Sequence, residues 1–86
     1  MSNAIVIKLS HNDVRVLDDT VKHVLDHIES LTRVHGVNDV SLTVNPKVSS
    51  LQSRSIYIRN MNDKLLAVMQ KIDVPHGVGL FITTED

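Results

Sequence analysis

The sequence contains no cysteine, almost no aromatic residues and no excess of either charge. The absence of cysteine excludes disulfide bonds, thiolate metal sites and cysteine nucleophiles. Tyr57 and Phe81 are the two aromatic residues, so the core must be built from aliphatic side chains. A net charge of −1 gives no overall attraction to nucleic acid or to an anionic membrane. No apolar run reaches the ~20 residues of a membrane-spanning helix.

The length and composition are those of one small globular domain, residues 1–86. A chain of this length buries only roughly 60–65% of the surface of its unfolded state, which predicts a thin margin of stability or a stabilising partner. Because no cysteine and no secretory signal are present, we expect a cytoplasmic protein.

A long amphipathic helix is predicted over residues 13–35. Its apolar residues recur at steps of four and three, which places on one stripe Leu17, Val21, Val24, Ile28 and Leu31. The opposite side carries charged residues, and Gly36 is a usual residue just past a helix end. Such a one-sided helix is not stable alone in water, so the rest of the chain must supply a surface for it.

Four segments alternate apolar and polar residues as β-strands do: 4–9, 39–44, 54–59 and 78–83. The sets expected to face inward are Ile5, Ile7 and Leu9; Val40, Leu42 and Val44; Ile56 and Ile58; and Val78, Leu80 and Ile82. A second helix is predicted between the last two strands, with the stripe Met61, Leu65, Val68, Met69 and Ile72. A turn is predicted over 74–77, with Pro at its second and Gly at its fourth position.

The predicted order of elements is β-α-β-β-α-β. This order packs as an antiparallel four-stranded sheet with both helices on one face, so the predicted fold class is α+β, a ferredoxin-like sandwich. Right-handed crossovers place the first and third strands at the centre of the sheet.

Three segments of the chain match one known family. Asp-Val-Arg-Val-Leu-Asp at 13–18, Asn-Pro-Lys-Val at 45–48 with Ile58-Arg59 after it, and Leu66 to Val78 stand in order along the chain. They are similar to the Asp-His-Arg-Val-Leu-Asp, Ser-Pro-His-Val, Ile-Arg and Ala-Leu-Met-Lys-Leu-Asp-Leu-Pro-Ala-Gly-Val segments of the ribosomal protein S-ten family. The chain therefore resembles a divergent member of that small-subunit family.

The resemblance implies a binding protein rather than an enzyme. Members of the family bind ribosomal RNA and, with Nus factor B, act in transcription antitermination. This chain departs from them in a shortened hairpin, with Ser49-Ser50-Leu51-Gln52 where Lys and Arg are usual. Because RNA affinity depends on cationic side chains that neutralise phosphates, the resemblance implies docking onto a ribosomal or Nus-type protein more than RNA binding. A virus-encoded mimic of the host protein would have these features.

The first candidate site is the start and one flank of the long helix. It consists of Asp13, Arg15, Val16, Thr20, His23, His27 and Val34. Asp13 is alternatively a helix N-cap. His23 and His27 have the i, i+4 spacing of metal ligands, but the apolar ends of this flank favour a protein contact over zinc, so no metal is predicted.

The second and third candidate sites lie on the predicted sheet. Its open face carries Val6, Lys8, Tyr57 and Phe81, a patch that predicts a homodimer or partner contact, with stacking of RNA bases as the alternative. Near the shortened hairpin, the basic residues that would contact phosphate, or form an ordinary solvated edge, are Lys47, Arg54 and Arg59.

No spacing in the sequence places a nucleophile beside a base, and no Gly-rich phosphate loop is present. We therefore predict a non-enzymatic protein without cofactors that docks through its first helix. The competing hypothesis is a self-associating homodimer that uses the open face of the sheet. RNA binding is a third and weaker hypothesis.

Overall fold

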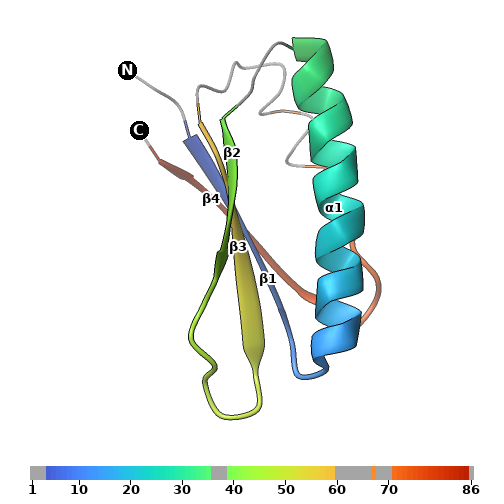
Figure 1. Cartoon of the computed structure of the whole chain (residues 1–86), viewed down its shortest axis with the longest axis vertical. Helices are drawn as coiled ribbons and strands as arrows, with labels where there is room; N and C mark the ends of the chain where they lie inside the picture. The colour runs from blue at the N-terminus through green and yellow to red at the C-terminus, as the bar shows by residue number, and fades with distance from the viewer. Residues whose placement is uncertain (1–3, 36–38, 60–66, 68–70, 86) are drawn as a thin grey trace.

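The computed structural model describes residues 4–35, 39–59, 67 and 71–85 of the chain. Its elements are β1 (Ala4–His11), α1 (Val14–His35), β2 (Val40–Val44), β3 (Gln52–Ile58) and β4 (Gly79–Glu85). The strands form one sheet, and α1 runs along one of its faces (Figure 1). None of the helices among these residues is long and apolar enough to cross a membrane.

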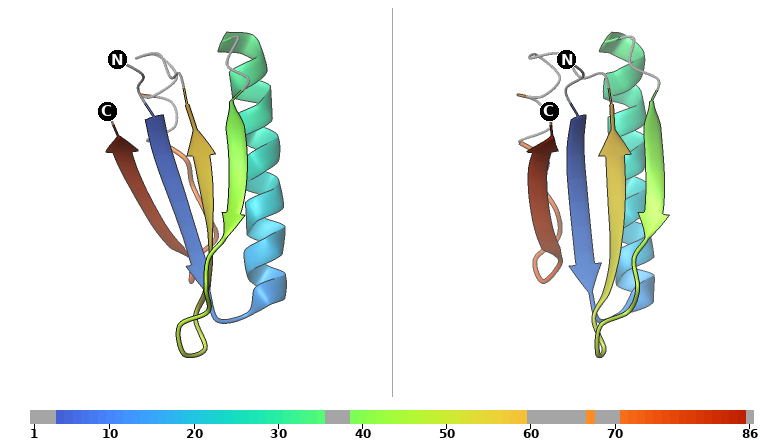
Figure 2. Two further views of the ribbon diagram at one scale, coloured as in Figure 1. Left: turned by 60° about the vertical axis from the view of Figure 1, so that its left-hand side comes forward. Right: turned by 90° about the vertical axis from the view of Figure 1, so that its left-hand side faces the viewer.

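The four strands lie in the order β2-β3-β1-β4, and every neighbouring pair is antiparallel (Figure 2). The structure confirms an α+β class, a four-stranded antiparallel sheet, and the central positions of β1 and β3. The predicted second helix falls mainly on residues outside the described ones. From its stripe, Ile72 is described; it is not helical, and it packs against the core.

The core lies between α1 and the two central strands. Its fully buried side chains are Ile5, Ile7, Leu9, Leu17, Ile28, Ile56 and Ile58. Val21 and Val24 on α1 are 5% and 4% exposed. The helical stripe and the inward sets of β1 and β3 are therefore confirmed. These aliphatic side chains supply most of the stability, because burying each one contributes about 1.5–3 kcal/mol.

The inward set of β2 is less buried than the alternation predicts. Val40 is half-buried, but Leu42 is 46% exposed and Val44 is 65% exposed. The reason is the position of α1, which packs on β1 and β3 and leaves the edge strand largely uncovered.

The predicted turn at 74–77 is displaced by one residue. The backbone N–H of Val78 donates to the carbonyl of Pro75 over 3.2 Å, so the turn runs from Pro75 to Val78. Gly77 is its third residue, with φ at 96°. A positive φ at the third position favours glycine, and this requirement fixes the register of the turn. Val78 is 8% exposed and lies just before β4 rather than inside it.

A short hairpin connects β2 to β3. Val48 and Leu51 exchange both backbone hydrogen bonds around the two-residue turn Ser49-Ser50. Ser49 has φ at 56°, at the first central position, where such turns favour glycine or asparagine. Both Val48 and Leu51 are exposed, at 68% and 48%.

Candidate functional site

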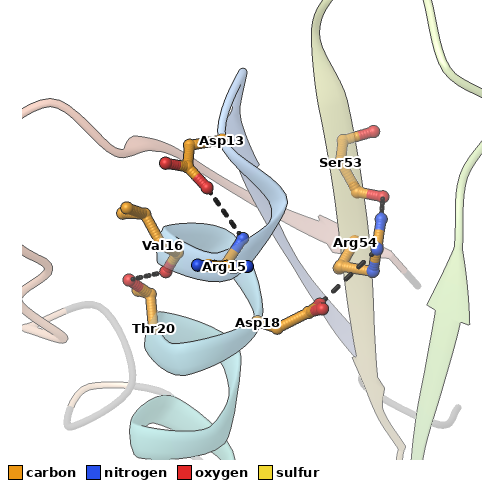
Figure 3. Close-up of polar contacts among 7 residues, drawn as sticks. All are labelled: Asp13, Arg15, Val16, Asp18, Thr20, Ser53 and Arg54. Atoms are coloured by element: carbon orange, nitrogen blue, oxygen red, sulfur yellow. Dashed lines mark hydrogen bonds and ion pairs between the residues drawn. The ribbon is translucent and has the colours of Figure 1, made fainter.

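The start of α1 is held by Asp13 as an N-cap. Its Oδ1 accepts the backbone N–H of Arg15 at 2.9 Å (Figure 3). Its carbonyl accepts the backbone N–H of Leu17 at 3.0 Å. The backbone N–H of Asp13 itself donates to Nδ1 of His11 at 2.8 Å. Asp13 therefore stabilises the start of the helix, and such an N-cap typically contributes about 1 kcal/mol. Arg15 is exposed.

Thr20 is the one member of the predicted flank whose side chain is buried among the described residues. It is 3% exposed, and its hydroxyl donates to the carbonyl of Val16 at 2.8 Å (Figure 3). Val16 is 38% exposed and Val34 is 81% exposed. Thr20 thus adds little surface for a partner, while the two valines leave apolar surface at both ends of the flank.

Between these valines, α1 borders a hollow of about 440 Å³. Its lining includes Thr20, His23, Val24, His27, Ile72 and Pro75. The side chain of His23 is 79% exposed, and its Nε2 lies 3.9 Å from Oδ2 of Asp19. The fold thus joins the predicted histidine pair to residues 71–75, which lie outside the predicted site. The apolar side chains of Ile72 and Val74 could have indicated in the sequence that this segment packs against the rest of the chain. In the structure both pack against the core.

The acidic and histidine side chains of the described residues do not converge into a metal site. None of them forms a group of three or more that could hold a metal ion. The rim of the hollow nevertheless combines both charges with imidazole, because Asp19, Lys71 and Asp73 also line it. The hollow therefore has an apolar floor and a polar rim whose side chains can form hydrogen bonds.

The face of the sheet opposite α1 carries the second predicted site. The register places Val6 between Tyr57 and Thr83, and Lys8 between Ser55 and Phe81. Phe81 is 65% exposed. A shallow hollow of about 560 Å³ lies at the β1–β4 side of this face, lined by residues that include Val6, Lys8, Ser10, Gly79, Phe81 and Thr83.

The half of this face nearer the hairpin is closed by a polar cluster. The side-chain amide of Asn45 donates to the hydroxyls of Ser53 and Ser55 at 3.1 and 2.8 Å. Both serines are buried, at 7% and 5% exposure. Apolar surface on the open face is therefore left mainly by Val6, Phe81 and the half-buried Tyr57.

Of the three basic residues predicted near the hairpin, Arg59 lies instead at the opposite end of β3, beside Asp39. Arg54 is on β3 with its side chain 11% exposed, and its Nη2 lies 3.5 Å from Oδ1 of Asp18 on α1 (Figure 3). Its Nη1 donates to the carbonyl of Ser53 at 3.0 Å. Nη1 of Arg59 lies 3.6 Å from Oδ1 of Asp39, and Lys47 is exposed. Two of the three predicted phosphate contacts thus have carboxylate partners.

Comparison with known proteins identifies a fold rather than a family. No protein-family model and no curated protein match the chain. Among solved structures, the de novo designed protein Foldit4 is similar with a TM-score of 0.64 and 14% identity, over 100% of this chain and 98% of the other. The de novo designed protein Ferredog-Diesel is similar with a TM-score of 0.62 and 10% identity, over 100% and 85%.

A third similar structure is LarC2, the C-terminal domain of a cyclometallase involved in the synthesis of the NPN cofactor of lactate racemase. It covers 100% of this chain and 58% of that one at 19% identity, and its TM-score of 0.46 is too low to bear on the fold. The two designed proteins define the class of this chain as a small α+β domain with a helix packed on an antiparallel sheet.

Proposed function

We propose that the chain is a cytoplasmic, non-enzymatic protein-binding domain, a trimmed relative of ribosomal protein S-ten that docks onto a ribosomal or Nus-type partner. The docking surface is the flank of α1 that borders residues 71–75. The observation that carries the proposal is the hollow of about 440 Å³ on this flank, with the exposed Val16 and Val34 along the same side of the helix.

The shape and lining of this hollow suit the anchor residue of a protein partner. Its volume lies within the ~300–1,000 Å³ of typical binding pockets. Interfaces commonly fill such a pocket with one large side chain and surround it with polar contacts. Val24, Ile72 and Pro75 would contact an apolar anchor, while His23 and His27 offer hydrogen bonds at the rim.

We further infer that the chain completes a ferredoxin-like βαββαβ sandwich, with a second helix within residues 60–70. β3 and β4 each pair antiparallel with β1, so they run parallel to one another. Parallel strands need a crossover of a dozen or more residues, which is usually a helix. NMR chemical shifts typical of a helix over this segment would support the inference, and extended or coil shifts would contradict it.

The charged side chains of this protein favour a protein partner over RNA. Arg54 and Arg59 each lie beside a carboxylate, and the net charge of the chain is −1. RNA affinity that depends on phosphate neutralisation falls steeply with salt. We expect no such salt-dependent binding to RNA.

Two valines on opposite flanks of α1 provide a matched test with purified Nus factor B and small ribosomal subunits. Val16 and Val14 are 38% and 37% exposed, in the same turn of the helix. Val16→Glu should weaken binding at least tenfold, because it places a charge beside the proposed contact, whereas Val14→Glu should change it less than twofold. Equal losses from both variants, or no binding of either partner by the unmodified chain, would contradict the proposal.

A second candidate function is a homodimer formed through the open face of the sheet. It is favoured by the exposure of Phe81, at 65%, beside the shallow hollow that Val6 and Lys8 line. In this case Phe81→Lys should convert a stable dimer to a monomer in light scattering and leave the melting temperature nearly unchanged. Binding of a Nus-type partner by a monomer would favour the first function instead.

A further inference from the structure

Among the described residues, the backbone groups on the outer edge of β2 have no partner. β2 stands at one end of the sheet and, in the described part of the chain, pairs with β3 alone. Arg59 N donates to Asp39 O at 2.9 Å, and Asn45 N donates to Ser53 O at 3.1 Å. In an antiparallel ladder such bonded pairs alternate with pairs whose groups point away. The N–H and C=O groups of Val40, Leu42 and Val44 therefore point outward.

This edge lacks the features that usually protect an edge strand. Natural sheets shield their edges with charged residues, proline or bulges. Residues 40–44, Val-Ser-Leu-Thr-Val, contain no charge and no proline. Leu42 and Val44 add exposed apolar side chains next to the free backbone groups, on the side of the sheet where α1 lies.

We propose that β2 pairs with β2 of a second copy of this chain, antiparallel, around a twofold axis at Leu42. This register sets Leu42 against Leu42 of the other copy, Val40 against Val44, and Ser41 against Thr43. Apolar residues then meet apolar residues on one face, and hydroxyl residues meet hydroxyl residues on the other. Each outward residue of one copy exchanges both backbone hydrogen bonds with its opposite residue.

The other edge of the sheet differs from β2 in its burial. In β4, antiparallel pairing around Phe81 would also set Leu80 against Ile82. Both of these residues, however, are half-buried and pack against the core of their own chain, whereas Leu42 and Val44 of β2 are exposed. A self-complementary strand with exposed apolar side chains on the side of α1 is therefore found at β2, and it favours a second copy as the partner.

The twofold axis is perpendicular to the sheet, so it places both copies of α1 on the same face. The exposed apolar side chains of both edge strands then lie together between the two helices. Val14, 37% exposed, stands one turn before Asp18, whose carboxylate reaches Arg54 on β3. It therefore lies on the same side of α1 as β2 and extends the apolar surface that the second copy covers.

This interface is independent of the proposed docking flank. His23 and His27 lie on the other side of α1, where they line the hollow together with residues 71–75. Val16 shares this side of the helix by its spacing from them. A dimer joined through β2 would leave both of its docking flanks accessible. Variants at Leu42 should therefore leave binding of the docking partner unchanged. Each proposal can thus be contradicted by experiment without contradicting the other.

Because the sequence has no cysteine, single cysteine variants give a direct test. Opposite residues of a bonded antiparallel pair have Cα atoms ~5.5 Å apart, within the range of a disulfide. Under mild oxidation, Leu42→Cys should form a covalent dimer at least tenfold faster than Phe81→Cys, which is a control at a more exposed position on the open face. Equal rates for the two variants, or faster cross-linking of Phe81→Cys, would overturn the proposal.

A second experiment removes a backbone hydrogen-bond donor from the outer edge of β2. Leu42→Pro eliminates an N–H that faces away from β3, so the fold should be retained, as checked by circular dichroism. Light scattering across a wide concentration range should show a dimer for the unmodified chain and a monomer for Leu42→Pro. A chain that stays monomeric at every concentration, or a folded Leu42→Pro variant that still dimerises, would contradict pairing through β2.

Discussion

Two neighbouring strands of the sheet have the same pattern and different surroundings. Ile56 on β3 and Leu42 on β2 are directly opposite each other and belong to alternating segments of similar composition. Ile56 is 0% exposed, whereas Leu42 is 46% exposed. The difference arises because α1 lies over β1 and β3. Alternation therefore determines which side a residue faces, and the position of the helix determines whether that side is buried.

The sharpest test of this comparison is to truncate both partners of the pair. Ile56→Ala should lower the free energy of unfolding by about 2–5 kcal/mol, because it leaves a cavity in the aliphatic core. Leu42→Ala should lower it by less than ~1 kcal/mol, as for most substitutions away from the core. Urea denaturation of both variants at a concentration where the chain is monomeric measures the difference. Similar losses would show that β2 is as well covered as β3.

Two ion pairs, one nearly buried and one exposed, allow the same comparison for polar contacts. Asp18→Asn should cost about 1–2 kcal/mol, since it deprives the nearly buried guanidinium of Arg54 of its carboxylate. Asp39→Asn removes a carboxylate from a pair whose side chains are both about half exposed, and should cost less than ~1 kcal/mol.

Thermal unfolding at low and high salt separates the two pairs. Added salt should reduce the small effect of Asp39→Asn and leave most of the effect of Asp18→Asn. If Asp39→Asn were the more costly change, the burial of Arg54 would have no energetic consequence, and this part of the comparison would be wrong.

The smallest expected effect lies at the tip of the hairpin. Ser49 has a positive φ, which costs a non-glycine residue about 1–2 kcal/mol. Ser49→Gly should therefore raise the free energy of unfolding by about 0.5–1 kcal/mol after the greater flexibility of unfolded glycine is taken into account. Ser50→Gly is the matched control and should give no gain. A loss from Ser49→Gly would mean that the turn has a different conformation.

Much of the fold follows from periodicity in the sequence. The stripe on α1 and the alternation in β1 and β3 predict the buried set, because each period fixes which side chains share a face. The central positions of β1 and β3 follow from the order of elements and the handedness of crossovers. The exposure of Leu42 could not be predicted in this way, since it depends on where one helix lies across the sheet.

The candidate site was less accessible to sequence reasoning than the fold. The histidine flank was predicted from its spacing, but its other wall comes from residues 71–75, which are distant in sequence. Asp18 lies beyond the first turn of α1 and pairs with Arg54 on β3. Such long-range pairings leave no local pattern, because neither residue alone indicates its partner.

The place of β1 in the sheet has a consequence for how the chain folds. β1 is the first strand in the sequence, yet its two neighbours are β3 and β4, and Ala4 is paired with Glu85. Bringing such distant segments together costs loop entropy before any contact rewards it, so folding is slow compared with that of helical domains. During synthesis, one edge of β1 stays unpaired until β4 has been made, and in this interval the chain is open to aggregation or to capture by chaperones.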